Sequence, residues 1–275
     1  MGAVDFEKLW LNILRSAMKI PGVKVQRDEF LRRELLKSRL SAMLVDGAVS
    51  SNPIAASIPI NEIDKIADRV IGEHTTVAVA FAAGAGIPGG WWMAATIPAD
   101  MAQFYWHALQ VMQKLAYLYG WGDIFSEGED MDEETLLLIT VFLGVMFGAD
   151  SAVSAVTYLA NAVAKQALKR IPKMALTKFG LYNTAKQVLK WVGISLTKQI
   201  TAETAAKVIP FIGAILNGAV TLFTFQPMCK KYMEHMKKQS SVFGASTADM
   251  SSEEEGAEKC DEREGEDGSS LVPAT

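Results

Sequence analysis

The feature that most constrains the fold is an uncharged, glycine-rich segment with helical patterns on both sides. Residues 75–99 contain no Asp, Glu, Lys or Arg, and GAGIPGG (84–90) interrupts the middle of this run. The flanking residues place apolar side chains at helical spacing. We therefore predict an all-α fold without a sheet, in which Thr75–Gly120 forms antiparallel apolar helices bent at Ile87-Pro88-Gly89.

The letters GAGIPG also match the dinucleotide-binding fingerprint, but their context argues against nucleotide binding. The upstream residues keep helical spacing without a break, and Trp91 and Trp92 follow where a phosphate-binding helix would begin. We instead expect the glycines of the apolar segments to bring helices close together, including a GxxxG pair. The glycines given this role are Gly84, Gly86, Gly89, Gly90, Gly144, Gly148, Gly213 and Gly218.

Helical periodicity continues through most of the remaining chain. It predicts a short amphipathic helix over Phe6–Met18, a second over Arg27–Val49, a third capped by Asn61, and a long apolar helix over Thr135–Ala164. The basic side chains of the second helix, Arg32, Arg33, Lys37 and Arg39, are expected to face solvent, with a docking face as the alternative. Together these segments predict a single helical bundle.

A polar stripe runs along the helix that begins after Pro98. Asp100, Gln103, His107 and Gln110 follow one another at steps of three and four residues, so they share one helical face, which Lys114 continues. Two interpretations remain open: a stripe exposed to water, or a buried ladder of hydrogen bonds or polar pocket. The apolar positions around the stripe favour burial. No metal-ligand spacing such as HExxH occurs, and we predict neither a metal nor a cofactor.

Charge divides the chain into a basic body and an acidic tail. The net charge is −4, but residues 240–275 hold ten acidic residues against Lys259 and Arg263, so this segment carries −8 and residues 1–239 carry +4. The tail composition is typical of disorder. We predict a short N-terminal helix in 1–27, one helical domain in 28–238 and a disordered tail in 239–275. Nucleic acid is an unlikely match for a body that combines this small positive charge with long apolar runs.

A basic amphipathic stretch precedes a second uncharged segment, Val208–Cys229. Between Lys165 and Lys207 there are nine basic residues and one acid, Glu203. Such a stretch suits an anionic membrane surface, where each base contributes on the order of 1 kcal/mol. Because Gly and Pro interrupt both uncharged segments, we expect shallow insertion from the cytoplasmic side and not two clean spans. The candidate membrane-surface residues are Lys165, Lys169, Arg170, Lys173 and Lys178.

Three blocks of the sequence resemble the EcsC family. They are ADRVIGEH (67–74), IPADMAQFYWHALQVMQKLAYLYGW (97–121) and IPFIGAILNGAV (209–220), and the likeness covers roughly residues 28–238. The resemblance implies a bacterial, mostly helical, membrane-associated protein whose family namesake is encoded beside an ABC transporter. It brings no established catalytic residues.

Three functions are compatible with these patterns. The first is a non-enzymatic accessory protein bound to the cytoplasmic leaflet, with an ABC transporter or another membrane protein as partner. The second is a soluble helical bundle that binds a lipid-like ligand, and the third is an enzyme that uses Asp100 and His107. The uncharged segments favour the first. The two cysteines, Cys229 and Cys260, are too few for a disulfide framework and suit a reduced intracellular setting.

Overall fold

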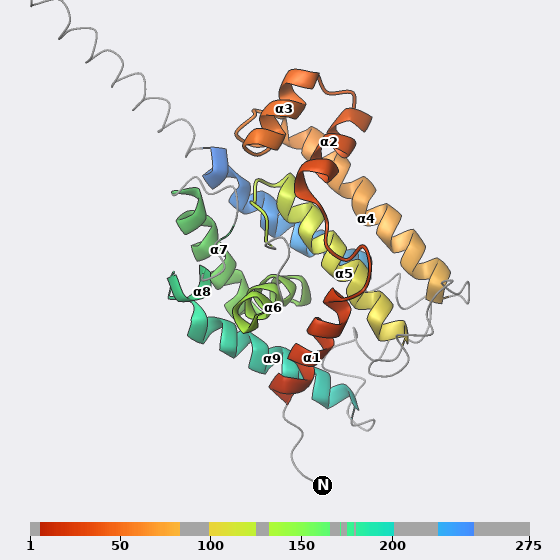
Figure 1. The fold of residues 1–275 in the computed structure, drawn as a ribbon, viewed down its shortest axis with the longest axis vertical. Helices are drawn as coiled ribbons and strands as arrows, with labels where there is room; N and C mark the ends of the chain where they lie inside the picture. The colour runs from red at the N-terminus through yellow and green to blue at the C-terminus, as the bar shows by residue number, and fades with distance from the viewer. Residues whose placement is uncertain are drawn as a thin grey trace, which may run out of the picture.

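A computed structural model describes residues 6–82, 99–124, 132–165, 171, 175–178, 180–200 and 225–244. This part of the chain is helical and contains no strand, so the predicted all-α fold is confirmed for it (Figure 1). The proposed bend at residues 87–89 and the acidic residues beyond 244 lie outside the described residues. So do six of the eight glycines, namely Gly84, Gly86, Gly89, Gly90, Gly213 and Gly218.

Two long helices, α4 (Ile60–Ala82) and α5 (Ala99–Leu118), pack against each other in antiparallel orientation. The pairing is visible in two contacts: the Tyr119 hydroxyl bonds Asp64 near one end, and His107 meets His74 nearer the other. In α5 nearly every side chain from 104 to 118 is buried, because this helix is apolar around most of its circumference. It therefore occupies the centre of the bundle (Figure 1).

The N-terminal helix α1 spans Phe6–Met18, the range predicted from its periodicity. Its Trp10 is fully buried and meets the rings of Tyr105 and Phe147 edge to face, with centroids 5.4 and 6.5 Å away. The indole Nε1–H donates to the hydroxyl of Thr140 at 2.9 Å. This bond satisfies the one polar atom of a large buried side chain, and it joins α1 to α6 (Glu133–Phe147).

The predicted helix Arg27–Val49 is in fact two helices, α2 (Arg27–Lys37) and α3 (Ala42–Ser50). The Ser38 hydroxyl bonds the Glu34 carbonyl, and Arg39 adopts a positive φ of 59°. Ser41 then caps α3 by accepting the amide N–H of Leu44 at 3.4 Å. Short serine-to-backbone bonds of this kind compete with helix continuation, and they explain why the single-helix prediction was wrong.

The predicted helix Thr135–Ala164 is also divided, into α6 (Glu133–Phe147) and α7 (Asp150–Ala164). Gly148 has φ 87°, and the next amide, Ala149 N–H, bonds the Gly144 carbonyl at 2.8 Å. This is the left-handed glycine stop of a helix C-terminus. The two glycines of the GxxxG pair therefore differ in role, because Gly144 alone lies where helices approach closely.

The start of α4 differs by two positions from the prediction, in which Asn61 is the cap. The helix begins at Ile60, where the Pro59 carbonyl accepts the amide N–H groups of Glu62 and Ile63 at 2.9 and 3.2 Å. Asn61 is thus a first-turn residue and not the cap. The expected continuation of this helix into the uncharged segment is confirmed, since α4 reaches Ala82.

The C-terminal part of the described chain comprises α8 (Ala175–Lys178), α9 (Tyr182–Ile200) and a helix over 225–244. In α9, one face packs on α1, α6 and α7. The 225–244 helix extends past the predicted domain boundary at 238, because Phe243 is buried against the ring of Trp121 at 5.3 Å. The segment predicted as tail therefore begins with six helical residues.

Candidate functional site

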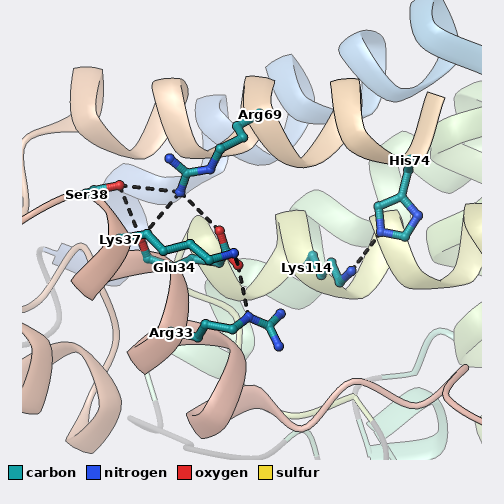
Figure 2. A network of polar contacts seen from close by, with 7 residues as sticks. All are labelled: Arg33, Glu34, Lys37, Ser38, Arg69, His74 and Lys114. Carbon is teal, nitrogen blue, oxygen red and sulfur yellow. Dashed lines mark hydrogen bonds and ion pairs between the residues drawn. The ribbon is translucent and has the colours of Figure 1, made fainter. Parts of the chain in front are cut away.

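A chain of three nitrogen-bearing side chains crosses the interface between α4 and α5. His74 on α4 places its Nδ1 2.9 Å from Nδ1 of His107 on α5, and its Nε2 lies 2.7 Å from the Lys114 ammonium (Figure 2 draws His74 and Lys114). Both histidines are buried. Lys114 stands two helical turns after His107, so one imidazole from α4 bridges two side chains of α5.

The direction of these hydrogen bonds follows from the donors available. A protonated Lys114 can only donate, so Nε2 of His74 accepts and a neutral His74 carries its proton on Nδ1. That proton is donated to Nδ1 of His107, which then carries its own proton on Nε2. The three groups form a directed path along which a proton could move from Lys114 to His107.

Burial and like charge keep this path neutral at the imidazoles. Burial lowers the pKa of His74 to about 2, with further lowering by Lys114 and then His107. Burial also lowers the pKa of His107 to about 4, and Lys114 adds to the effect. The pKa of Lys114 falls to about 8, first through burial and then through the charge of Arg33. Near neutral pH the site therefore holds one ammonium group beside two neutral imidazoles.

The predicted polar stripe is placed only in part by the structure. His107 and Gln110 are both buried, and Gln110 donates through Nε2 to the Gly22 carbonyl at 2.5 Å. The side chains of Asp100 and Gln103 lie outside the described residues. The stripe thus divides: His107 and Lys114 meet His74, whereas Gln110 secures the turn after α1.

Sequence reasoning missed two members of this region. His74 does not stand out as a site residue in the sequence, although it ends the block ADRVIGEH at the point where the uncharged run begins. Gln113 was not singled out, yet it is fully buried and joins α5 to the chain between α1 and α2. Its Oε1 accepts the Val25 N–H and its Nε2 donates to the Val23 carbonyl, both at 2.8 Å.

A second polar cluster surrounds Glu34 on α2, beside the His74–Lys114 contact (Figure 2). Its buried carboxylate receives Arg33 Nε at 3.1 Å, Lys37 Nζ at 2.9 Å and Arg69 Nη2 at 3.0 Å. Hydrogen bonds from Lys37, Arg33 and Arg69 lower the pKa of Glu34 against the opposing effect of burial. The carboxylate is therefore ionised at neutral pH.

The basic face predicted for the Arg27–Val49 region, Arg32, Arg33, Lys37 and Arg39, is exposed, which confirms the prediction. Arg32 is exposed and pairs with Asp46 at 2.8 Å, as expected for a surface position. Arg27 is instead buried, and its guanidinium donates to the carbonyls of Val49 and Ser51 at 3.1 and 2.6 Å. A cation at the carbonyl end of α3 satisfies groups that a helix terminus leaves unpaired.

The remaining predicted positions are described unevenly. Lys165 and Lys178 are exposed, whereas Lys169, Arg170 and Lys173 lie outside the described residues. Within the described ranges there is no group of three or more His, Cys, Asp or Glu side chains that could hold a metal ion. Among the described helices, none has the length and apolar character required to cross a bilayer.

No protein-family model, curated protein or solved structure matches this chain. The geometry of the site is therefore the basis for proposing a function.

Proposed function

We propose that this protein is a non-enzymatic, membrane-associated accessory protein of the EcsC type, bound to the cytoplasmic leaflet through one end of its helical bundle. The observation that carries the proposal is the position of the helix ends that flank its uncharged segments. Residues 83–98 join α4 to α5, and uncharged residues 208–224 lead into Phe225. Phe225 lies 5.8 Å from the ring of Phe104 and 6.4 Å from that of His107.

These contacts place Phe225 beside the N-terminal half of α5, the half that also follows residues 83–98 in the chain. Apolar, glycine-rich segments attached at one side of a bundle are suited to shallow insertion into a lipid surface. The EcsC-like blocks of the sequence support the same proposal, and they add an ABC transporter as the proposed protein partner.

The basic stretch begins at the other end of α5. The Ile171 N–H bonds the Asp123 carbonyl at 2.9 Å, just beyond the C-terminal end of that helix. With 20 residues, α5 is about 30 Å long. Charges at one end are screened from a surface at the other, because the Debye length is about 10 Å at 0.1 M salt. We therefore assign the main attachment to the apolar end, with the basic stretch contributing only if α5 lies along the surface.

Flotation with phospholipid vesicles tests this proposal. Trp91→Asp with Trp92→Asp should reduce binding to neutral and anionic vesicles alike. Changing Lys169, Arg170, Lys173 and Lys178 to Gln should weaken binding to anionic vesicles only and reduce its salt dependence. An effect of both variants would indicate that α5 lies parallel to the membrane. A wild-type protein that floats with neither vesicle would refute membrane attachment.

The chain from Lys114 through His74 favours a second candidate, an enzyme in which His107 acts in proton transfer. A buried path of this kind can supply or remove a proton at His107 Nε2. The test is His107→Gln in cells that lack the native protein. A variant that melts like wild type but fails to restore the phenotype would support catalysis, whereas full restoration would exclude it.

A further inference from the structure

The cluster around Glu34 holds more positive charge than its own hydrogen bonds require. One carboxylate, 2% exposed, faces three cations whose side chains are 50% (Arg33), 49% (Lys37) and 36% (Arg69) exposed. The three cations and one anion leave a local charge of +2. Figure 2 shows the carboxylate between Arg69 on one side and Arg33 on the other, with Lys114 nearby on α5.

Only one of these ion pairs joins separate helices. Arg69 comes from α4 and links it to α2, through Nη2 bonds to the Glu34 carboxylate and to the Ser38 hydroxyl at 3.4 Å. Arg33 and Lys37 come from α2 itself, one residue before and three residues after Glu34. Cross-linking of α2 to α4 therefore explains Arg69, whereas Arg33 and Lys37 pair with a carboxylate of their own helix whose charge Arg69 already balances.

The donors that remain on Arg33 match an anion. Within the described residues, Arg33 bonds only through Nε, which leaves both of its Nη groups available, whereas Arg69 bonds through Nη2 and its Nε is buried. A guanidinium presents its donors as a planar fork that matches the oxygens of phosphate. Glu34 accepts one hydrogen bond from Arg33 and one from Lys37, and both side chains are half exposed, so their other donors are left for an anion.

Lys114 extends the positive field inward from this cluster. Its pKa is lowered by burial and by the charges of Arg33 and Lys37, while Glu34 and Glu73 act in the opposite direction. Four cations thus share a region with two acids. An anion bound at Arg33 and Lys37 would relieve this repulsion.

We propose that Arg33, Lys37 and Arg69, organised by the buried carboxylate of Glu34, form a binding site for a phosphate group. The group would belong to a soluble phosphate ester or to a phospholipid headgroup, which offer the same oxygens to the same donors. The proposal does not depend on apolar membrane attachment, since the site is built from described residues of α2 and α4.

The test is titration of the full-length protein with inorganic phosphate and glycerol phosphate by calorimetry, and with phosphatidylcholine vesicles with and without phosphatidic acid by flotation. The test variant is Arg33→Gln with Lys37→Gln. The matched control is Arg32→Gln with Lys65→Gln, which removes the same charge from exposed positions paired with Asp46 and Glu62. Melting curves establish that both variants are folded.

We expect the test variant to weaken binding of the phosphate probes by about tenfold or more, and the control by less than about twofold. Saturable binding of glycerol phosphate that the test variant loses would identify a soluble ester. Dependence on phosphatidic acid that the test variant alone loses would identify a lipid headgroup. Equal losses in both variants, or no saturable binding of any probe, would overturn the site. Binding to pure phosphatidylcholine vesicles should be unchanged in the test variant. A result that refutes the phosphate site can therefore be told apart from one that refutes membrane attachment.

Discussion

His74 and His107 face each other through their Nδ1 atoms, 2.9 Å apart, in the buried interface of α4 and α5. The two rings are nearly perpendicular, with an interplanar angle of 80°. Only one of the two Nδ1 atoms can carry the shared proton, so the contact is lost when both imidazoles are protonated, and the Lys114 ammonium at Nε2 opposes protonation of His74. The stability of the bundle is therefore linked to the state of two side chains.

Replacing His107 with Ala should destabilise the protein by about 1–3 kcal/mol, because it leaves the Nδ1–H of His74 buried without an acceptor. The matched control is His235→Ala in the 225–244 helix, where Nε2 has no hydrogen-bond partner in the described structure. That change should alter the free energy of unfolding by less than about 0.5 kcal/mol. Urea unfolding of the two variants measures the difference, and equal effects would argue against the His74–His107 bond.

Acid should destabilise the protein already at pH values well above those at which carboxylates titrate. The unfolded histidines bind protons below their ordinary pKa of 6.5, whereas the folded pKa values of His74 and His107 are about 2 and about 4. The unfolded state then binds more protons, so stability falls as pH falls. Between pH 7 and pH 5 we expect a loss of about 2 kcal/mol for each histidine.

Urea unfolding at pH 7, 6 and 5 measures this dependence. His74→Gln with His107→Gln should remove most of the slope. The single variant His235→Gln should keep most of it, because His235 is less buried than the pair. A slope that persists in the double variant would assign the acid sensitivity to other groups.

Gly144→Ala should destabilise the bundle by about 1–3 kcal/mol through overpacking. A Cβ at this position would lie 2.6 Å from Cγ1 of Val188 on α9 and 2.8 Å from Cβ of Ala152 on α7. Gly72→Ala is the matched control, because a Cβ there meets nothing within 4 Å. It should stabilise α4 by about 0.5–1 kcal/mol. Thermal melts that show no difference between the two variants would contradict the close packing of α6.

Truncation experiments should place the C-terminal boundary of the folded body at residue 244 and not at residue 238. A chain ending at Gly244 should melt like the full-length protein, while one ending at Lys238 loses the buried Phe243 and exposes Trp121. Limited proteolysis should likewise stop near 244. Identical melting temperatures for the two truncations would show that the last turn of the helix adds no stability.

Local periodicity was sufficient to predict several elements. The range of α1, the continuation of α4 to Ala82 and the start of α5 after Pro98 all follow from apolar spacing within one helix. The breaks at 38–41 and at Gly148 were missed because each is made by only a few residues inside a pattern that otherwise continued. Single serines and glycines also occur in helix interiors. The apolar pattern alone therefore does not distinguish a residue that ends a helix from one inside a continuing helix.

Only the part of the site that lies on a single helix could be predicted from the sequence. His107 and Lys114 share a face of α5, and their spacing shows this. Their meeting with His74 depends on the register of α4 against α5, which a single sequence does not encode as a periodic signal. The burial of Arg27 has the same origin: its partners are carbonyls at the C-terminal end of α3, which a continuous helix from Arg27 to Val49 would have placed about 33 Å away.

The two ends of the described chain are secured by contacts between residues that are far apart in sequence. The Trp10–Thr140 bond joins positions 130 residues apart, and the Lys237–Asp64 bond joins positions 173 apart. Neighbouring helices such as α4 and α5, or α6 and α7, can pair early, whereas closing loops of this length costs more entropy and slows folding. The order of assembly should therefore run from the middle outward. An unfinished chain that lacks the 225–244 helix would present Trp121 and the acids of α4 as an uncovered surface, a substrate for chaperones and proteases until that helix docks.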